Sequence, residues 1–175
     1  YARYRMDYPD AVYAELDRAF PSDGAGVLLD LGTGTGLIAL HLARRFERVV
    51  ALDVSAEMVA VARRLIADRG ETNVEAHVLA ADAIAALDGT PAGGPYRLVT
   101  IGSAFHWMDQ PRVLDLAYDR TEVGGGVFIA ALPGFITPDN VHVDDHLAGT
   151  IIEVVRKYLG ERRRAGSGFY GTHPR

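Results

Sequence analysis

Three glycines that follow an aspartate form the first stretch of this sequence that could do chemistry. Gly32, Gly34 and Gly36 occupy alternate positions, beginning two residues after Asp30. Glycines permit tight turns, and a helix N-terminus offers unpaired N–H groups, so a strand, this loop and a helix predict an anion or nucleotide site. Asp53 ends the next apolar run, where its carboxylate can accept hydrogen bonds from both ribose hydroxyls. The pattern indicates an adenosine-type ligand.

The glycine spacing separates two classes of nucleotide. A dinucleotide fingerprint has the form G-x-G-x-x-G, whereas residues 32–36 have the form G-x-G-x-G. A buried Asp30 just before the loop would repel a pyrophosphate held at the helix N-terminus. We therefore expect a ligand that is cationic at this end. A nicotinamide-dependent dehydrogenase is a disfavoured alternative. The non-functional alternative is that the glycines only form a tight turn from strand to helix and bind no ligand.

His106 and Trp107 follow another apolar run, and loops beyond strand ends are where open α/β sheets bind ligands. His106 could act as a general base for an acceptor that must lose a proton; the alternative is that it orders its loop. Trp107 could shield a cationic ligand, because an aromatic face attracts a cation by about 0.5 to 2 kcal/mol. The alternative for Trp107 is packing at the edge of the core.

The elements that must position these residues alternate along the chain. Continuous apolar runs predict strands buried on both faces, and the segments between them have helical periodicity. This alternation predicts an α/β fold with a doubly wound, Rossmann-like parallel sheet. The expected strands are 27–31, 48–53, 74–80, 96–102 and 126–132, and the expected helices are 36–46, 55–70, 110–125 and 143–160.

The loop and the segments after it resemble the motifs of class I S-adenosylmethionine (SAM)-dependent methyltransferases. "DLGTGTG" (30–36), "VVALDVSAEMVAVAR" (49–63) and "LAADA" (79–83) are similar to the motifs of the first three strands. "YRLVTIGSAFHWMD" (96–109) and "YARYRMDYPD" (1–10) resemble a type 11/25-like subgroup that methylates small molecules and has a His-Trp pair after strand four. In the second of these segments, Met6 replaces the usual proline.

The resemblance implies a role for each matching position. The acid of the first motif, here Asp30, neighbours the methionine amino group, and the glycines pass under the sulfonium and ribose. Asp53 binds the ribose hydroxyls, Met58 lies near the adenine, Asp82 takes the adenine amino group and the Ala83 backbone contacts a ring nitrogen. Further cofactor contacts are implied for Tyr1, Arg5, Thr33, Val54, Ser103 and Trp107.

Domain organisation follows from length and from the resemblance. We expect one SAM-binding domain over residues 1–175, with an N-terminal cap (1–23), a Rossmann-like core (24–132) and a helix and tail (133–175). Class I methyltransferases usually finish the sheet with two further strands, and no convincing strand pair follows residue 132. The sequence therefore predicts that the C-terminal strands are missing and that the chain is part of a longer protein.

Composition limits the partners. The net charge of −5 argues against a nucleic-acid partner, which needs clustered Lys and Arg. No apolar run is long enough to span a membrane, and the absence of cysteine suits a reducing cytoplasm. The Arg- and Ala-rich composition is typical of a high-GC bacterium. We expect a small-molecule substrate and leave open whether the protein is a monomer or a dimer.

A metal site is one alternative interpretation of "HVDDH" (142–146), because His142 and His146 could share a helix face. Asp144 and Asp145 are better explained as the acidic first turn of a helix, so no metal is predicted. The expected function is transfer of a methyl group from SAM to oxygen, nitrogen or carbon of an acceptor, which leaves S-adenosylhomocysteine (SAH). The alternative is a SAM-binding module without catalysis, used for assembly or sensing.

Overall fold

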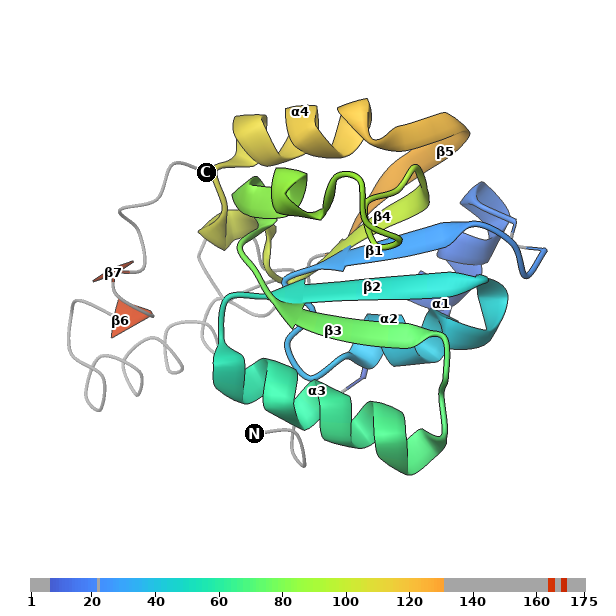
Figure 1. Cartoon of the computed structure of the whole chain (residues 1–175), viewed down its shortest axis with the longest axis horizontal. Helices are drawn as coiled ribbons and strands as arrows, with labels where there is room; N and C mark the ends of the chain where they lie inside the picture. Colours follow the sequence, from blue (N-terminus) through green and yellow to red (C-terminus); the bar gives the residue numbers. More distant parts are fainter. Residues whose placement is uncertain (1–6, 22, 131–163, 166–167, 170–175) are drawn as a thin grey trace, which may run out of the picture. The chain divides into compact units, whose positions relative to one another are not determined.

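A parallel sheet forms the frame of the structure (Figure 1). The computed structural model describes residues 7–21 and 23–130, and the backbone of 164–165 and 168–169. The five strands of this sheet lie in the order β3-β2-β1-β4-β5. The order reverses between β1 and β4, which makes their carboxyl ends the topological switch point. The strand bounds are β1 Val27–Leu31, β2 Arg48–Asp53, β3 Val74–Val78, β4 Tyr96–Gly102 and β5 Thr121–Ala130.

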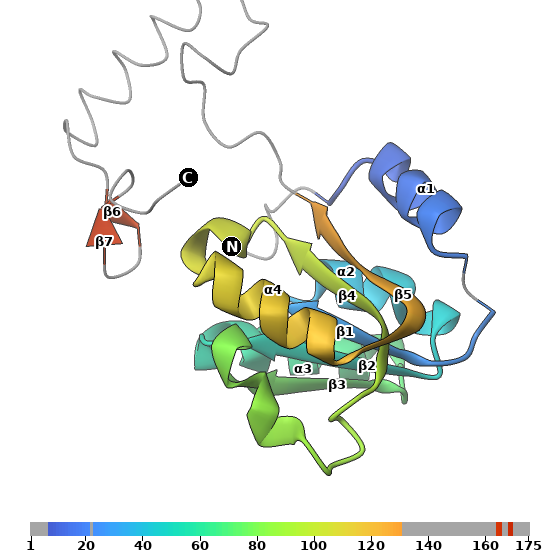
Figure 2. The ribbon, with the colours of Figure 1, turned by 90° about the horizontal axis from the view of Figure 1, so that it is seen from above.

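Helices cover both faces of the sheet. Figure 2 shows α4 on one side of the strands and α1 with α2 on the other. The α-helices are α1 Asp10–Ala19, α2 Leu37–Leu42, α3 Ala56–Arg69 and α4 Gln110–Asp119, and the 3-10 helices are η1 Ala43–Arg45, η2 Ala81–Leu87 and η3 Phe105–Trp107. This arrangement confirms the predicted doubly wound α/β fold. None of the described helices is long and apolar enough to cross a membrane.

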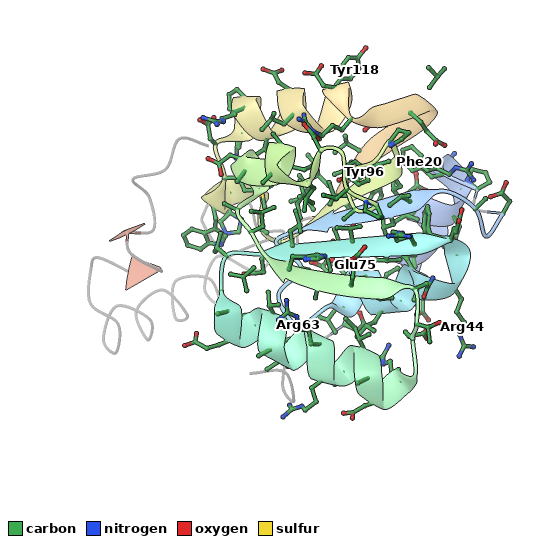
Figure 3. All side chains as sticks on the ribbon, in the orientation of Figure 1. Phe20, Arg44, Arg63, Glu75, Tyr96 and Tyr118 are labelled. Carbon is green, nitrogen blue, oxygen red and sulfur yellow. The ribbon has the colours of Figure 1, made fainter. Side chains whose placement is uncertain are left out.

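The core lies on both faces of the central strands because successive side chains point in opposite directions. Leu29 and Leu31 of β1 belong to a buried cluster that includes Ile84 of η2 and Val113 of α4. Tyr96 is fully buried, and its hydroxyl donates to the Ala92 carbonyl at 2.6 Å (Figure 3). Tyr118 of α4, by contrast, points away from the sheet (Figure 3).

Helix α3 matches the predicted helix over 55–70. Ser55 caps its N-terminus by accepting a hydrogen bond from the Met58 N–H at 3.3 Å. Gly70 ends it in the left-handed conformation, with φ of 67°, as a C-terminal glycine cap requires. The predicted helix over 36–46 is divided into α2 and η1.

The predicted helix over 110–125 is wrong in its last part. Helix α4 ends at Asp119, and residues 121–125 belong to β5. Gly124, Gly125 and Gly126 disfavour helix, and the Thr121 hydroxyl closes the last turn by donating to the Ala117 carbonyl at 2.7 Å. Strand β3 likewise ends at Val78 instead of continuing to residue 80.

The chain divides into two compact units, residues 1–131 and 132–175. In the second, β6 (Arg164–Ala165) pairs antiparallel with β7 (Gly168–Phe169) in a sheet of its own. The predicted helix over 143–160 and the end of the predicted strand 126–132 lie outside the described residues. The subdivision into 1–23, 24–132 and 133–175 stays a prediction.

Candidate functional site

Two cavities share four lining residues at the carboxyl ends of β1, β2, β3 and β4, where an open α/β sheet binds its ligands. The Asp30 lobe has a volume of about 210 Å³ and the Asp82 lobe about 270 Å³. The shared residues are Gly32, Asp53, Ala104 and Trp107. Together the two lobes have the size of a small-ligand pocket, roughly 300 to 1,000 Å³. We call them the cleft.

The glycine turn between β1 and α2 is built from left-handed backbone. The φ angles of Gly32, Gly34 and Gly36 are 67°, 58° and 86°. Residues with a Cβ rarely adopt such positive φ angles. A Cβ on Gly32 would lie 2.4 Å from the Ala104 Cβ, whereas a Cβ on Gly34 would meet no heavy atom within 4 Å. The turn thus brings bare backbone against the loop after β4 and leaves open space at Gly34.

Asp30 is a buried carboxylate beside this turn, with 1% of its surface exposed. Its oxygens accept hydrogen bonds from the hydroxyls of Thr33 at 2.6 Å and Thr100 at 2.7 Å. Burial raises the pKa of the Asp30 carboxyl to about 6, against the opposing effect of these two hydrogen bonds. Burial therefore makes the negative charge of Asp30 costly, and a cation beside it would relieve that cost.

We expect the pH dependence of stability to report this cost. The ordinary pKa of an aspartate is 3.8, and that of Asp30 is about 6 in the folded protein. Between these values the folded state binds more protons than the unfolded state, so the contribution of Asp30 to the free energy of unfolding falls as the pH rises from 3.8 to about 6. Two pKa units correspond to about 3 kcal/mol.

Urea denaturation of wild type and Asp30→Asn across this window measures the effect. As the pH rises, the free energy of unfolding of Asp30→Asn should increase relative to that of wild type by up to about 3 kcal/mol. Asp68→Asn, at an exposed position on α3, makes the same change in net charge and is the control for that change. A difference between Asp30→Asn and wild type that is constant with pH would contradict the assignment.

Asp53, at the end of β2, lies where the two lobes meet. One carboxylate oxygen accepts the Gly34 N–H at 2.8 Å, and the other accepts the Ser55 N–H at 2.9 Å. Each carboxylate oxygen can accept a further hydrogen bond. The side chain is thus oriented by the glycine turn and remains able to accept from ligand hydroxyls.

The Asp82 lobe is formed by the loops after β2 and β3. Val54, 72% exposed, and Asp82 line it. Ala83 is not among its lining residues, and the Ala83 N–H donates to the Ala80 carbonyl at 3.0 Å. The implied contact of the Ala83 backbone with an adenine nitrogen would have to replace that hydrogen bond if it used this N–H. Met58 lines the Asp30 lobe and not this one.

The loop after β4 supplies the wall shared by both lobes. Ser103 has a φ of 51° and lines the Asp30 lobe, while Trp107, 43% exposed, lines both lobes. The His106 side chain is exposed and lines neither lobe. Its ring lies 4.6 Å from the Trp107 ring at an interplanar angle of 47°. The structure therefore places His106 beside the wall and not within the cleft.

Tyr8 also lines the Asp30 lobe, although it is not among the site residues predicted from the sequence. Its hydroxyl donates to the Ser103 Oγ at 3.0 Å across 95 residues of sequence. The tyrosine stands in the segment that resembles the subgroup, which is the one signal that could have indicated it.

Of the other site residues predicted from the sequence, two lie within the described residues and four lie outside them. Thr33 lines the Asp30 lobe, whereas Gly36 is the N-cap residue of α2 and lines neither lobe. Tyr1, Arg5, His142 and His146 lie outside the described residues. Across residues 7–21 and 23–130 no cluster of His, Asp and Glu could hold a metal ion.

Electrostatically, the cleft is acidic. Among its described lining residues, four are aspartates (Asp30, Asp53, Asp82 and Asp109) and none is Lys, Arg or His. A polyanion such as a pyrophosphate would find no cationic partner there, whereas a cationic ligand would be attracted.

A family model described as a methyltransferase domain matches residues 28–125. The chain belongs to this methyltransferase family. The matched residues carry β1 to β4 and most of the cleft, so the methyltransferase assignment rests on the segment that builds the site. No curated protein matches the chain.

Solved structures agree with this assignment of the methyltransferase fold. A Bacillus halodurans protein described as a methyltransferase is 23% identical, with a TM-score of 0.60, over 86% of this chain and 61% of its own. DhpI, solved with SAH, is 30% identical, with a TM-score of 0.51, over 68% of this chain and 55% of its own. An rRNA methylase from Streptococcus thermophilus is 18% identical, with a TM-score of 0.57, over 73% of each chain. The chain thus spans 61% and 55% of the first two proteins.

Proposed function

We propose that this methyltransferase uses SAM as its methyl donor and modifies a small-molecule acceptor at oxygen, nitrogen or carbon. The observation that carries the proposal is the buried Asp30 carboxylate in a cleft whose described lining residues include no basic side chain. SAM carries an ammonium and a sulfonium, so its charge suits this environment, whereas a dinucleotide pyrophosphate does not. This difference disfavours the dehydrogenase alternative.

Several residues fit the parts of SAM. Asp30 would stabilise the ammonium group, and Asp53 would accept hydrogen bonds from the ribose hydroxyls. The open space at Gly34 would admit the ligand close to the backbone. Asp82 would accept a hydrogen bond from the adenine amino group in the second lobe. The names of similar structures, one of them solved with SAH, support the same cofactor.

When bound, SAM supplies an activated methyl group. The chain's own contribution is to hold the acceptor in line with that methyl, because positioning alone is worth up to about 7 to 11 kcal/mol. Trp107 would shield the cation, with about 0.5 to 2 kcal/mol of cation–π attraction. A general base is required only for an acceptor that must lose a proton, and His106 would reach such an acceptor only if its exposed ring turned toward the cleft.

The acceptor is proposed to be small because the protein is acidic. Nucleic-acid binding depends on clustered Lys and Arg, whereas the net charge is −5 and the described cleft lining is acidic. The similar rRNA methylase shows a shared fold at 18% identity. We also propose that the chain belongs to the His-Trp subgroup, which the loop after β4 resembles.

Isothermal titration of the protein with SAM, SAH and NADH tests the cofactor. We expect saturable binding of SAM and SAH and none of NADH. Binding of NADH without SAM would overturn the proposal in favour of the dehydrogenase, and failure to bind SAM at millimolar concentration would overturn it outright.

Transfer of a labelled methyl group tests catalysis. The protein is incubated with methyl-labelled SAM and either a protein-free metabolite extract or purified RNA. Label in the metabolite fraction supports the proposal, and label in RNA overturns the small-molecule acceptor. SAM binding with no transfer to either fraction favours the non-catalytic module for assembly or sensing.

A further inference from the structure

Tyr8 connects the N-terminal segment to the cleft. Its side chain is 7% exposed and lines the Asp30 lobe. The hydroxyl donates a hydrogen bond to the Ser103 Oγ at 3.0 Å. A residue that precedes α1 therefore contacts the loop that follows β4.

The absence of a side chain at Gly102 makes room for the Tyr8 side chain. A Cβ on Gly102 would lie 2.7 Å from the Tyr8 hydroxyl oxygen and 2.4 Å from the Ile38 Cδ1, so only glycine leaves room at the end of β4. The Tyr8 ring also meets the Tyr13 ring edge to face, with centroids 6.4 Å apart. Tyr8 is therefore fixed between the sheet and α1.

Its partner Ser103 holds a strained conformation. The φ of 51° lies in the left-handed region, which costs a residue with a Cβ some backbone energy. The Ser103 N–H donates to the Ala130 carbonyl at 2.7 Å, and the hydrogen bond from Tyr8 adds a further restraint. The backbone turns here into η3 and carries Ala104 and Trp107 to the boundary of the two lobes.

We propose that Tyr8 is a positioning residue of the cleft, which acts through Ser103 to hold Ala104 and Trp107 as the wall shared by both lobes. The wall abuts the glycine turn, because a Cβ on Gly32 would overlap Ala104. Loss of the hydrogen bond would loosen this wall where the lobes meet. The expected effect on the affinity for SAM rests on the proposed function, but the expected effect on the position of Ala104 and Trp107 does not.

The variant Tyr8→Phe removes the hydroxyl and keeps the ring. Trp107 is the sole tryptophan of the chain, so its fluorescence reports on the wall directly. In ligand-free protein we expect acrylamide to quench Trp107 more strongly in Tyr8→Phe than in wild type. The Kd for SAM should rise about 2- to 10-fold, as expected for the loss of one hydrogen bond.

Tyr13→Phe is the matched control. Tyr13 is 4% exposed, and its hydroxyl donates to the Asp7 Oδ1 at 2.8 Å, but it is not among the residues that line the cleft. This variant loses a similar hydrogen bond in the same segment. We expect Trp107 quenching and the Kd for SAM to stay at wild-type values.

A double-mutant cycle tests whether Tyr8 acts through Ser103. If it does, Ser103→Ala removes the same hydrogen bond, and the double variant should be quenched less than the sum of the two single effects predicts. Additive effects overturn the proposal. So does unchanged quenching in Tyr8→Phe, or equal quenching changes in Tyr8→Phe and Tyr13→Phe. If wild type binds no SAM, the proposed function fails, and quenching alone still decides this inference.

Discussion

Asp30→Asn is expected to raise the Kd for SAM by about 30-fold or more, because removing one partner of a buried charge pair costs about 2 kcal/mol or more. Asparagine keeps the shape of the side chain near Thr33 and Thr100 but not its charge. The cofactor-free variant should remain folded, since the ionised Asp30 carboxylate is itself unfavourable above its pKa of about 6. Lost binding would then reflect lost charge and not lost structure.

Titration calorimetry well above that pKa measures the effect, with Asp68→Asn as the control for net charge. Wild-type affinity for SAM should also fall as the pH drops below about 6, because a protonated Asp30 no longer attracts the ammonium. Asp30→Asn should lack this dependence. A variant that binds SAM as tightly as wild type would contradict the role of Asp30 in the cleft.

Gly32→Ala is expected to lower the free energy of unfolding by about 2 to 5 kcal/mol. The φ of 67° disfavours any Cβ by roughly 1 to 2 kcal/mol. The new Cβ would also lie 2.4 Å from the Ala104 Cβ, and such overpacking costs about 1 to 3 kcal/mol. This loss is a large part of the stability of a domain, roughly 5 to 15 kcal/mol.

Gly24→Ala separates the two causes. Gly24 has a φ of 84°, but a Cβ there would meet no heavy atom within 4 Å. Its substitution should therefore lose only the backbone contribution, about 1 to 2 kcal/mol. Urea denaturation measures both variants. Equal losses at Gly24 and Gly32 would show that the contact with Ala104 has no cost.

The order of strands and helices could be predicted because its signals are local. A capped helix between Ser55 and Gly70 is specified by residues within a few positions of each other. The error at residues 121–125 arose at a boundary, where three glycines outweighed the helical pattern before them. The end of a helix depends on such local conflicts, which periodicity over a longer window averages out.

The cleft was predictable where parallel strands alone determine position. Asp30, Asp53 and Asp82 follow strands whose carboxyl ends meet at one edge, so their proximity follows from the fold. The position of Tyr8 could not be predicted in this way. Its contact with Ser103 depends on the space that Gly102 leaves at the end of β4, about 95 residues away in sequence. The exposure of His106 likewise depends on how η3 turns after Ser103.

The position of β1 between β2 and β4 also has a consequence for synthesis on the ribosome. The Thr100 hydroxyl, which donates a hydrogen bond to Asp30, lies 70 residues further along the chain. At roughly 5 to 20 residues per second, synthesis of that interval takes roughly 4 to 14 s. During this time the nascent chain holds β1 without one of its two neighbours and Asp30 without one of its two hydroxyl donors. The cleft is therefore completed only after β4 and the lining residues that follow it, Ser103 to Val113, have left the exit tunnel.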